Sequence, residues 1–265
     1  MKTSLLSPKQ SQGMTLLRLI VRWILPKRLL EMRARVVETR QHRRYQNLPM
    51  EQVFSEIYLN KEWGNDKSTY YSGSGSHDPT IVTPYIKAVH TLLASFPDKP
   101  ILVDLGSGDF NVGRNFVEFA KHYYACDIVV ELQEHNRKHF DFPNVEFLSL
   151  NAVDDTLPDG DIIFVRQVFQ HLSNVHIQQA LEKCQKYQRW VITEHLPSTS
   201  DFLPNTDITA GCGIRMLMNS GVVLTAPPFN VTGYATRVLC EVPEYGGVIR
   251  TILFERNELV NQAMG

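Results

Sequence analysis

Two glycines and two aspartates near the middle of the chain have the residue types and spacing of a nucleotide-binding site. The run Asp104-Leu105-Gly106-Ser107-Gly108 follows a short apolar stretch and precedes a stretch with helical spacing. Glycines between a strand and a helix let the backbone approach a ligand closely, and the helix start offers its N–H groups. Asp127 ends the next apolar stretch, where a carboxylate can accept hydrogen bonds from both hydroxyls of a ribose. The pattern therefore predicts a ribose-containing ligand; the alternative interpretation is a plain strand-to-helix turn with a solvated acid.

Two histidines follow later apolar stretches and are candidate general bases. His171 comes after the stretch 161–165, and His195 comes after 190–193 with Glu194 beside it. An imidazole can take a proton from a hydroxyl near neutral pH. Either histidine can also be a hydrogen-bonded structural residue, so both interpretations stay open.

Other polar residues are candidates for binding an anion or a substrate. The guanidinium of Arg166 suits bidentate contact with a carboxylate, and a structural ion pair fits it as well. The loop 72–76, which contains Ser74 and Gly75, offers backbone N–H groups to an anion or serves as a linker. Asp207 and Arg215 lie in a long irregular segment, 197–233, where a cover over the substrate is expected.

The elements that must position these residues alternate along the chain. Apolar stretches typical of buried strands alternate with helical patterns, and short loops join them. This alternation predicts an α/β domain with a mostly parallel, doubly wound sheet of Rossmann-like type. Residues 238–242 and 248–254 flank a Pro- and Gly-rich turn and predict a C-terminal antiparallel hairpin. The predicted strands are 101–105, 123–128, 145–150, 161–165, 190–193 and the two arms of the hairpin; the predicted helices are 51–60, 83–97, about 112–119, 131–140, 174–187 and a short one near 214–218.

The first 50 residues differ from the rest in charge. They contain eleven Lys and Arg and two acids, whereas the remaining chain carries 16 basic and 26 acidic residues. The apolar run 14–25 has twelve residues and includes Arg18 and Arg22, so it is too short for a spanning helix, which needs about 20 residues. It also lacks the cleavage site of a signal peptide. We therefore predict a basic amphipathic helical extension over 1–50.

The basic extension needs a partner, and two are considered. Residues 14–45 could lie on an anionic membrane surface through their arginines and apolar side chains. Alternatively, the extension packs on the acidic body and completes the fold. Nucleic acid is an unlikely partner, because the acidic body carries no RNA-binding motif.

The cysteines point to a reducing compartment and away from a metal site. The four cysteines lie far apart and form no CxxC pair. We expect no metal and a cytoplasmic location, with peripheral attachment at the inner membrane face if the extension binds lipid.

The glycine run resembles the first motif of class I S-adenosylmethionine-dependent methyltransferases, and Asp127 occupies the second-motif position. Asn151-Ala152 falls where that family contacts adenine, and the run 166–172 falls where it carries its fourth-strand motif. The resemblance covers about 98–256 and implies S-adenosyl-L-methionine as cofactor and a seven-stranded sheet that ends in an antiparallel hairpin. The cofactor residues that it implies are Asp104, Gly106, Ser107, Gly108, Asp127, Ile128, Asn151, Ala152 and Arg166.

A narrower resemblance concerns the acceptor. Trp63-Gly64, the loop 72–76 and Gln170-His171 look like a bacterial subgroup associated with surface-glycan genes. It implies methyl transfer to a small-molecule or glycan acceptor, at oxygen, with residues 51–97 capping the site and 197–233 covering the substrate. The residues expected to act on the acceptor are His171 and His195 as bases and Ser74, Gly75, Asp207 and Arg215 as contacts.

One departure from the family pattern concerns the glycine loop. Many relatives have a third glycine where Phe110 stands, so we expect the loop to turn before this residue. An NAD-dependent oxidoreductase is the alternative enzyme, but its G-x-G-x-x-G fingerprint requires a third glycine where Asn111 stands. A non-catalytic methyltransferase-like binding or scaffold protein is the alternative outside enzymes.

Overall fold

A single seven-stranded sheet organises the chain. The computed structural model describes residues 27–65, 69–244 and 246–259. The strands lie in the order β3-β2-β1-β4-β5-β7-β6. Strands β1 to β5 are parallel, and β7 runs antiparallel to both β5 and β6. The predicted Rossmann-like sheet with a C-terminal antiparallel hairpin is confirmed. The bounds are β1 Ile101–Leu105, β2 His122–Asp127, β3 Val145–Ser149, β4 Ile162–Arg166, β5 Arg189–Pro197, β6 Tyr234–Glu244 and β7 Gly247–Arg256.

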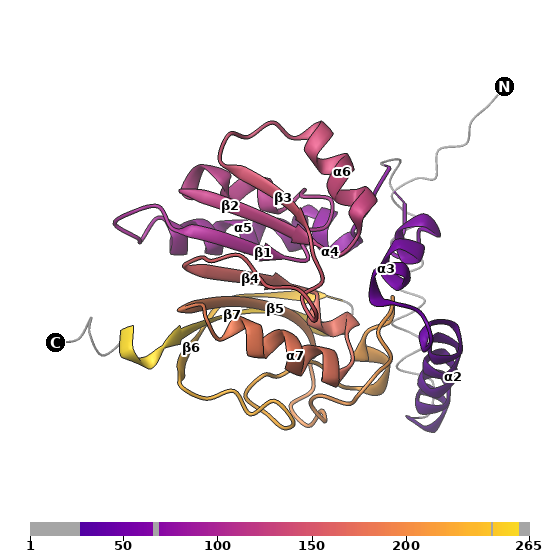
Figure 1. The fold of residues 1–265 in the computed structure, drawn as a ribbon. Helices are drawn as coiled ribbons and strands as arrows, with labels where there is room; N and C mark the ends of the chain where they lie inside the picture. The colour runs from indigo at the N-terminus through magenta and orange to yellow at the C-terminus, as the bar shows by residue number, and fades with distance from the viewer. Residues whose placement is uncertain (1–26, 66–68, 245, 260–265) are drawn as a thin grey trace.

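Helices cover both faces of this sheet (Figure 1). Because alternate residues of a strand point to opposite faces, Val103 and Leu105 join one apolar cluster and Leu102 joins another. The first cluster includes residues of α3, α6 and α7, and the second includes residues of α5 and η1. The helices are α2 Lys27–Tyr45, α3 Met50–Leu59, α4 Ser74–His77, α5 Pro79–Leu93, α6 Val130–His139 and α7 Asn174–Cys184, and the 3₁₀ turns are η1 Gly113–Phe119, η2 Phe169–His171 and η3 Arg215–Met218.

Two helical predictions need correction. The helix expected from Thr83 begins four residues earlier, at Pro79, because the carboxylate of Asp78 accepts the N–H of Thr80 at 2.8 Å and caps the helix there. Pro84 therefore lies inside α5 instead of at its start. The helix expected near 112–119 is a 3₁₀ turn, η1.

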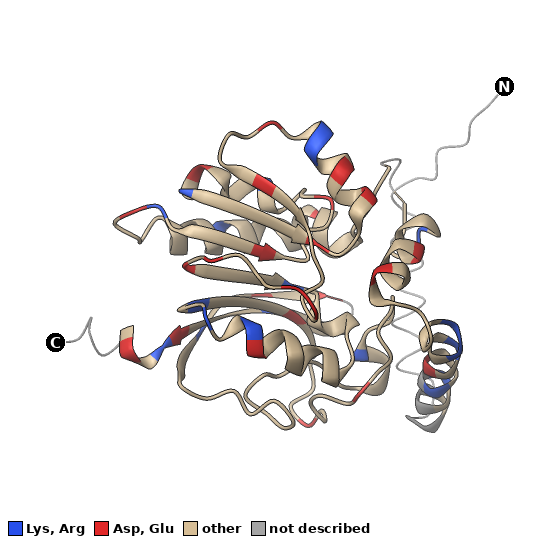
Figure 2. Ribbon diagram, viewed as in Figure 1, with Lys and Arg blue, Asp and Glu red and all other residues tan. Residues whose placement is uncertain are grey.

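The N-terminal helices lie beside the carboxyl ends of the parallel strands, on the right in Figure 1. Figure 2 shows Lys and Arg gathered on α2. The polar side of α2 faces the body, where Glu38, Gln41 and His42 contact Thr209. The amphipathic helix expected at 14–25 lies outside the described residues. Within the described part of the chain, no helix is long and apolar enough to cross a membrane.

Candidate functional site

The glycine loop leaves the end of β1 in a conformation that requires glycine. Gly106 and Gly108 have φ values of 75° and 56°, in the left-handed region that other residues enter at a cost. The N–H groups of Gly106 and Ser107 donate to the carbonyl of Cys126 on β2, at 2.8 and 2.9 Å. A Cβ atom on Gly106 would clash with the side chain of Val168. The side chains of Val168 and Ser72 therefore pack directly against the two glycines, and a side chain at either position would displace them.

Phe110 corrects the expectation that the loop turns before it. Its own φ is 59°, so the left-handed turn includes the residue that stands where many class I methyltransferases have a third glycine. Its ring is completely buried and packs edge-on against Tyr123 and Phe147, with centroid distances of 5.5 and 4.9 Å. Aromatic packing beneath the loop thus stabilises a backbone conformation that a bulky residue seldom adopts.

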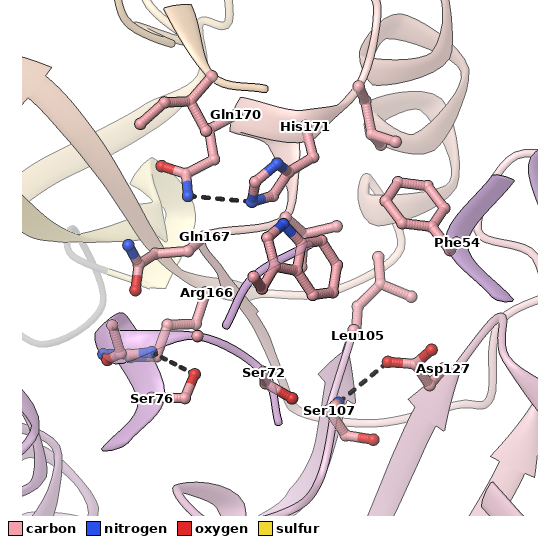
Figure 3. A pocket seen from close by; sticks show the side chains of 18 of the residues that line it. Phe54, Ser72, Ser76, Leu105, Ser107, Asp127, Arg166, Gln167, Gln170 and His171 are labelled. Carbon is pink, nitrogen blue, oxygen red and sulfur yellow. Dashed lines mark hydrogen bonds between the residues drawn. The ribbon is translucent and has the colours of Figure 1, made fainter. Parts of the chain in front are cut away.

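Asp127, at the end of β2, holds its carboxylate beside the loop (Figure 3). One oxygen, Oδ2, accepts the N–H of Gly108 at 3.0 Å, and Oδ1 accepts the N–H of Val129 at 3.0 Å. Burial raises the pKa of this carboxyl, while the two N–H groups lower it. The carboxylate is therefore oriented by backbone donors and still lines the cavity described below.

Asp104 has a different position from the other predicted cofactor residues. It lies beneath the loop and does not line the cavity that Asp127 lines. Its Oδ2 accepts the hydroxyl hydrogen of Tyr123 at 2.8 Å, and burial raises its pKa to about 6. Asp104 thus supports the loop from the side facing α5 instead of contacting a ligand in the main cavity.

One cavity of about 630 Å³ collects most of the predicted site residues. It opens at the carboxyl ends of β1 to β5, where open α/β sheets bind ligands. Phe54 of α3 and Trp63 form part of its wall together with Met50, for which no sequence pattern predicts a place in the site. The predicted residues that line it are Ser74, Gly75, Gly106, Ser107, Gly108, Asp127, Ile128, Asn151, Ala152, Arg166, His171 and His195.

At the rim after β3, Asn151 organises a short turn. Its Oδ1 accepts the N–H of Val153 at 2.9 Å, and its Nδ2 donates to Asp154 at 2.7 Å. These bonds fix the amide beside Ala152 in the cavity wall.

Arg166, at the end of β4, ties α4 to the sheet. Its Nη2 donates to the carbonyl of Gly75 at 2.6 Å, its Nη1 donates to Ser76 at 3.3 Å, and its guanidinium lies 4.8 Å from the ring centroid of Tyr85. Burial lowers the pKa of Arg166. Its buried Nε has no hydrogen-bond partner among the described residues.

The two candidate bases lie in the same cavity with different surroundings. The Nδ1 of His171 is 3.2 Å from the carbonyl oxygen of Gly213, and its Nε2 is 3.3 Å from the Nε2 of Gln170. Burial lowers the pKa of His171 to about 4, so its imidazole is neutral at neutral pH. His195 donates from Nε2 to the carbonyl of Glu244 at 2.8 Å and so faces the hairpin.

Asp207 and Arg215 do not join this cavity, contrary to expectation. Arg215 is 1% exposed, and its guanidinium donates to four backbone carbonyls and to Asn174. Asp207 accepts the N–H of Asn174 at 2.7 Å. Both side chains fasten the segment 205–215 to the body because they meet the backbone groups that helix α7 and turn η2 leave unpaired. The same segment still reaches the cavity through Cys212 and Ile214.

Comparisons with known proteins agree with this fold. No protein-family model and no curated protein matches the sequence. Among solved structures, the N-methyltransferase NodS from Bradyrhizobium japonicum WM9, in complex with S-adenosyl-l-homocysteine, superposes with a TM-score of 0.52 at 10% identity, over 77% of this chain and 98% of that chain. Human N-acetylserotonin methyltransferase in complex with SAM gives 0.49 at 16% identity, over 79% of this chain.

The chain spans 60% of the length of that human enzyme. Magnesium protoporphyrin IX methyltransferase (ChlM) from Synechocystis PCC 6803, with bound SAM, gives 0.49 at 10% identity, over 78% of this chain and 98% of that chain. The superposition on NodS and the strand order show that the chain has the Rossmann-like fold of class I methyltransferases.

Proposed function

We propose that the protein transfers a methyl group from S-adenosyl-L-methionine to an oxygen of a small-molecule or glycan acceptor. The observation that carries the proposal is the pairing of the glycine loop with the Asp127 carboxylate in one cavity. Gly106 and Gly108 line the cavity without side chains of their own, and Asp127 offers the acceptor that a ribose requires. The residues present therefore fit this cofactor.

The chain's own residues would bind and orient the reactants. Asp127 would accept the ribose hydroxyls, the loop would allow close approach, and Asn151 with Ala152 would border the adenine. Bound S-adenosyl-L-methionine supplies a methyl group on a sulfonium, so in-line positioning contributes much of the rate. His171 would accept a hydrogen bond from the acceptor hydroxyl, because its imidazole is neutral.

Calorimetric titration with S-adenosylhomocysteine tests the cofactor assignment. We expect Asp127→Ala to weaken binding by about 1–3 kcal/mol, because the ligand hydroxyls lose their acceptor. Asp141→Ala, which removes an exposed aspartate, is the control and should bind like the wild type. Tight NADH binding without S-adenosylhomocysteine binding would reject the proposal. Transfer of a labelled methyl group to fractionated extract separates an enzyme from a binding protein.

We also propose that α2 attaches the protein to an anionic membrane surface. Residues three and four apart share one side of a helix, and the side of α2 away from Gln41 combines apolar and basic residues. Such a face can enter a lipid interface while its arginines meet anionic headgroups. The exposed residues on this side are Leu29, Met32, Arg33, Val36, Arg40 and Arg43.

Vesicle flotation tests the membrane proposal. We expect salt-sensitive binding to vesicles of phosphatidylcholine and phosphatidylglycerol, and little binding to phosphatidylcholine alone. The double variant Arg33→Glu/Arg40→Glu should bind about tenfold or more weakly, because each basic residue contributes about 1 kcal/mol. The control, Arg114→Glu/Arg237→Glu, makes the same charge change at exposed positions outside α2. Equal loss in both variants would remove α2 from the contact.

A further inference from the structure

A continuous chain of hydrogen bonds crosses the acceptor end of the cavity. The backbone N–H of His195 lies 3.3 Å from Oε1 of Gln170, and Nε2 of Gln170 lies 3.3 Å from Nε2 of His171. The chain continues from Nδ1 of His171 to the carbonyl of Gly213, at 3.2 Å. The N–H of Gly213 then donates to Oε1 of Gln41, at 3.0 Å. These hydrogen bonds thus connect strand β5 to helix α2 through His171. Figure 3 shows the bond between Gln170 and His171.

Each bond in this chain has only one direction that is consistent with its atoms. The backbone N–H of His195 can only donate, so the Gln170 atom beside it is the carbonyl oxygen. The amide nitrogen of Gln170 therefore faces His171 and must donate to its Nε2. The remaining imidazole proton lies on Nδ1, where the carbonyl of Gly213 accepts it. The backbone at the two ends thus determines which nitrogen of His171 carries the proton.

Gln41 of α2 is the last residue in this series of hydrogen bonds. Its side chain is 6% exposed and donates from Nε2 to the carbonyl of Thr209 at 2.5 Å while Oε1 accepts from Gly213. A Cβ on Gly211 would lie 2.7 Å from Cδ of Gln41, and a Cβ on Gly213 would lie 2.8 Å from its Oε1. Two glycines are therefore needed for α2 to approach the backbone that accepts the proton of His171.

We propose that Gln170 and Gln41 are positioning residues that hold His171 as a neutral imidazole, with the proton on Nδ1 and with Nε2 as the acceptor for the substrate hydroxyl. The tautomer follows from the hydrogen bonds alone, whereas its use in catalysis rests on the proposed function. A bound hydroxyl takes the place of the Gln170 amide at Nε2. Gln170 is buried and His171 lies in the cavity wall, so this exchange needs only a local movement of one amide.

The reaction step that this arrangement serves balances in atoms and charge. The hydroxyl oxygen of the acceptor forms a bond to the methyl carbon, and the carbon–sulfur bond breaks with its electron pair left on sulfur. The hydroxyl proton passes to Nε2 of His171, whose Nδ1–H stays bound to Gly213 and stabilises the imidazolium. The charged group that acts on His171 is Arg215, which opposes its protonation. Proton release to water then restores the neutral ring.

Nitrogen-15 NMR of the unliganded full chain at pH 7 tests the tautomer. In the wild type we expect His171 to show a protonated Nδ1 and an unprotonated Nε2, with His171→Ala to assign the signals. In Gln170→Glu, one carboxylate oxygen can still accept from His195, but the other can no longer donate. His171 Nε2 must then carry a proton, so we expect an imidazolium at pH 7 and a titration midpoint raised from about 4 by about 3 pH units or more.

Gln167→Glu is the matched control for Gln170→Glu. Gln167 lines the same cavity and its amide lies against Gly75, so the change adds the same charge without touching the hydrogen-bond chain. His171 should keep its wild-type signals in this variant. In Gln41→Ala, the anchor of Gly213 is lost and we expect a mixture of both tautomers.

Three results would overturn the proposal: an unprotonated Nδ1 in the wild type, an equal effect of both glutamate variants, or wild-type signals in Gln170→Glu. Binding of S-adenosylhomocysteine, measured separately, should stay within about threefold in Gln41→Ala, because Gln41 lies outside the cavity lining. If the wild type binds no S-adenosylhomocysteine, the proposed function fails while the NMR result still decides the tautomer.

Discussion

The two ends of the cavity are built by different means. The glycine-loop end comes from consecutive strand ends, between Gly106 and Ala152, and the backbone N–H groups of Gly106, Ser107, Gly108 and Val129 make hydrogen bonds there. At the histidine end, α2, η2, β5 and the segment 205–215 meet through side chains, and Gln41 and Gly213 are 172 positions apart. Local backbone geometry therefore defines one end, and long-range side-chain hydrogen bonds define the other.

Adding a methyl group at Gly106 should have the largest effect on the stability and ligand binding of the glycine-loop end. Gly106→Ala places a Cβ against Val168 and keeps φ at 75°. We expect a loss of about 2–5 kcal/mol in the free energy of unfolding, from about 1–2 kcal/mol for the left-handed conformation and about 1–3 kcal/mol for overpacking. Calorimetry should also detect no S-adenosylhomocysteine binding.

Gly233→Ala separates the cost of the left-handed backbone conformation from the cost of overpacking. Its φ is 85°, but a Cβ there would meet no atom within 4 Å. Urea unfolding should therefore show only the conformational cost, about 1–2 kcal/mol, with ligand binding unchanged. If both variants lose the same stability and both bind S-adenosylhomocysteine, the absence of a side chain at Gly106 is not required for ligand binding.

At the histidine end of the cavity, Glu194 should make the free energy of unfolding depend on pH. This carboxyl is 3% exposed, accepts the N–H of Phe169 at 3.2 Å, and has a pKa raised by burial to about 8, against the opposing charge of Arg215. The folded state therefore holds this proton more tightly than the unfolded state. The contribution of Glu194 to stability is complete below about pH 4.5 and is lost as the pH rises through 8.

Glu194→Gln removes this dependence, because the amide oxygen can still accept from Phe169 and carries no charge. Urea unfolding at pH 5, 6.5 and 8 should show that the wild type loses stability relative to the variant, by on the order of 2–4 kcal/mol over this range. Asp104 titrates near pH 6 in both proteins and cancels in the difference. Glu182→Gln, at an exposed position of α7, should behave as the wild type. Parallel curves for Glu194→Gln and the wild type would contradict the buried, protonated Glu194.

The contrast also explains how far the sequence could be interpreted. The strand order and the glycine loop with Asp127 could be predicted, because each depends on apolar periodicity and on residues close together in sequence. Asp207 and Arg215 lie in the expected segment but not in the cavity lining. Three of the four backbone carbonyls that Arg215 binds, those of Phe169, Gln170 and Leu172, lie more than 40 positions earlier in the sequence. No local pattern could indicate that Gln41 contacts Gly213.

Phe110 illustrates a second limit. The missing third glycine predicted a shorter turn, yet the buried ring of Phe110 lies among Tyr123, Phe140 and Phe147, all of which come later in the chain. Its left-handed backbone depends on packing that forms only when β2, β3 and α6 are assembled. The sequence shows that a glycine is absent, but it does not show that aromatic packing stabilises the same left-handed backbone at Phe110.

The paired glycines under α2 have an evolutionary consequence. Because the amide of Gln41 occupies the volume where side chains at 211 and 213 would project, no one of these three positions can change size alone. A larger residue at either glycine requires a shorter one at 41, and with it the loss of the bonds to Thr209 and Gly213. Substitutions in the N-terminal extension of this chain are thereby coupled to substitutions near its C-terminal third, so the extension and the α/β domain must diverge as one unit.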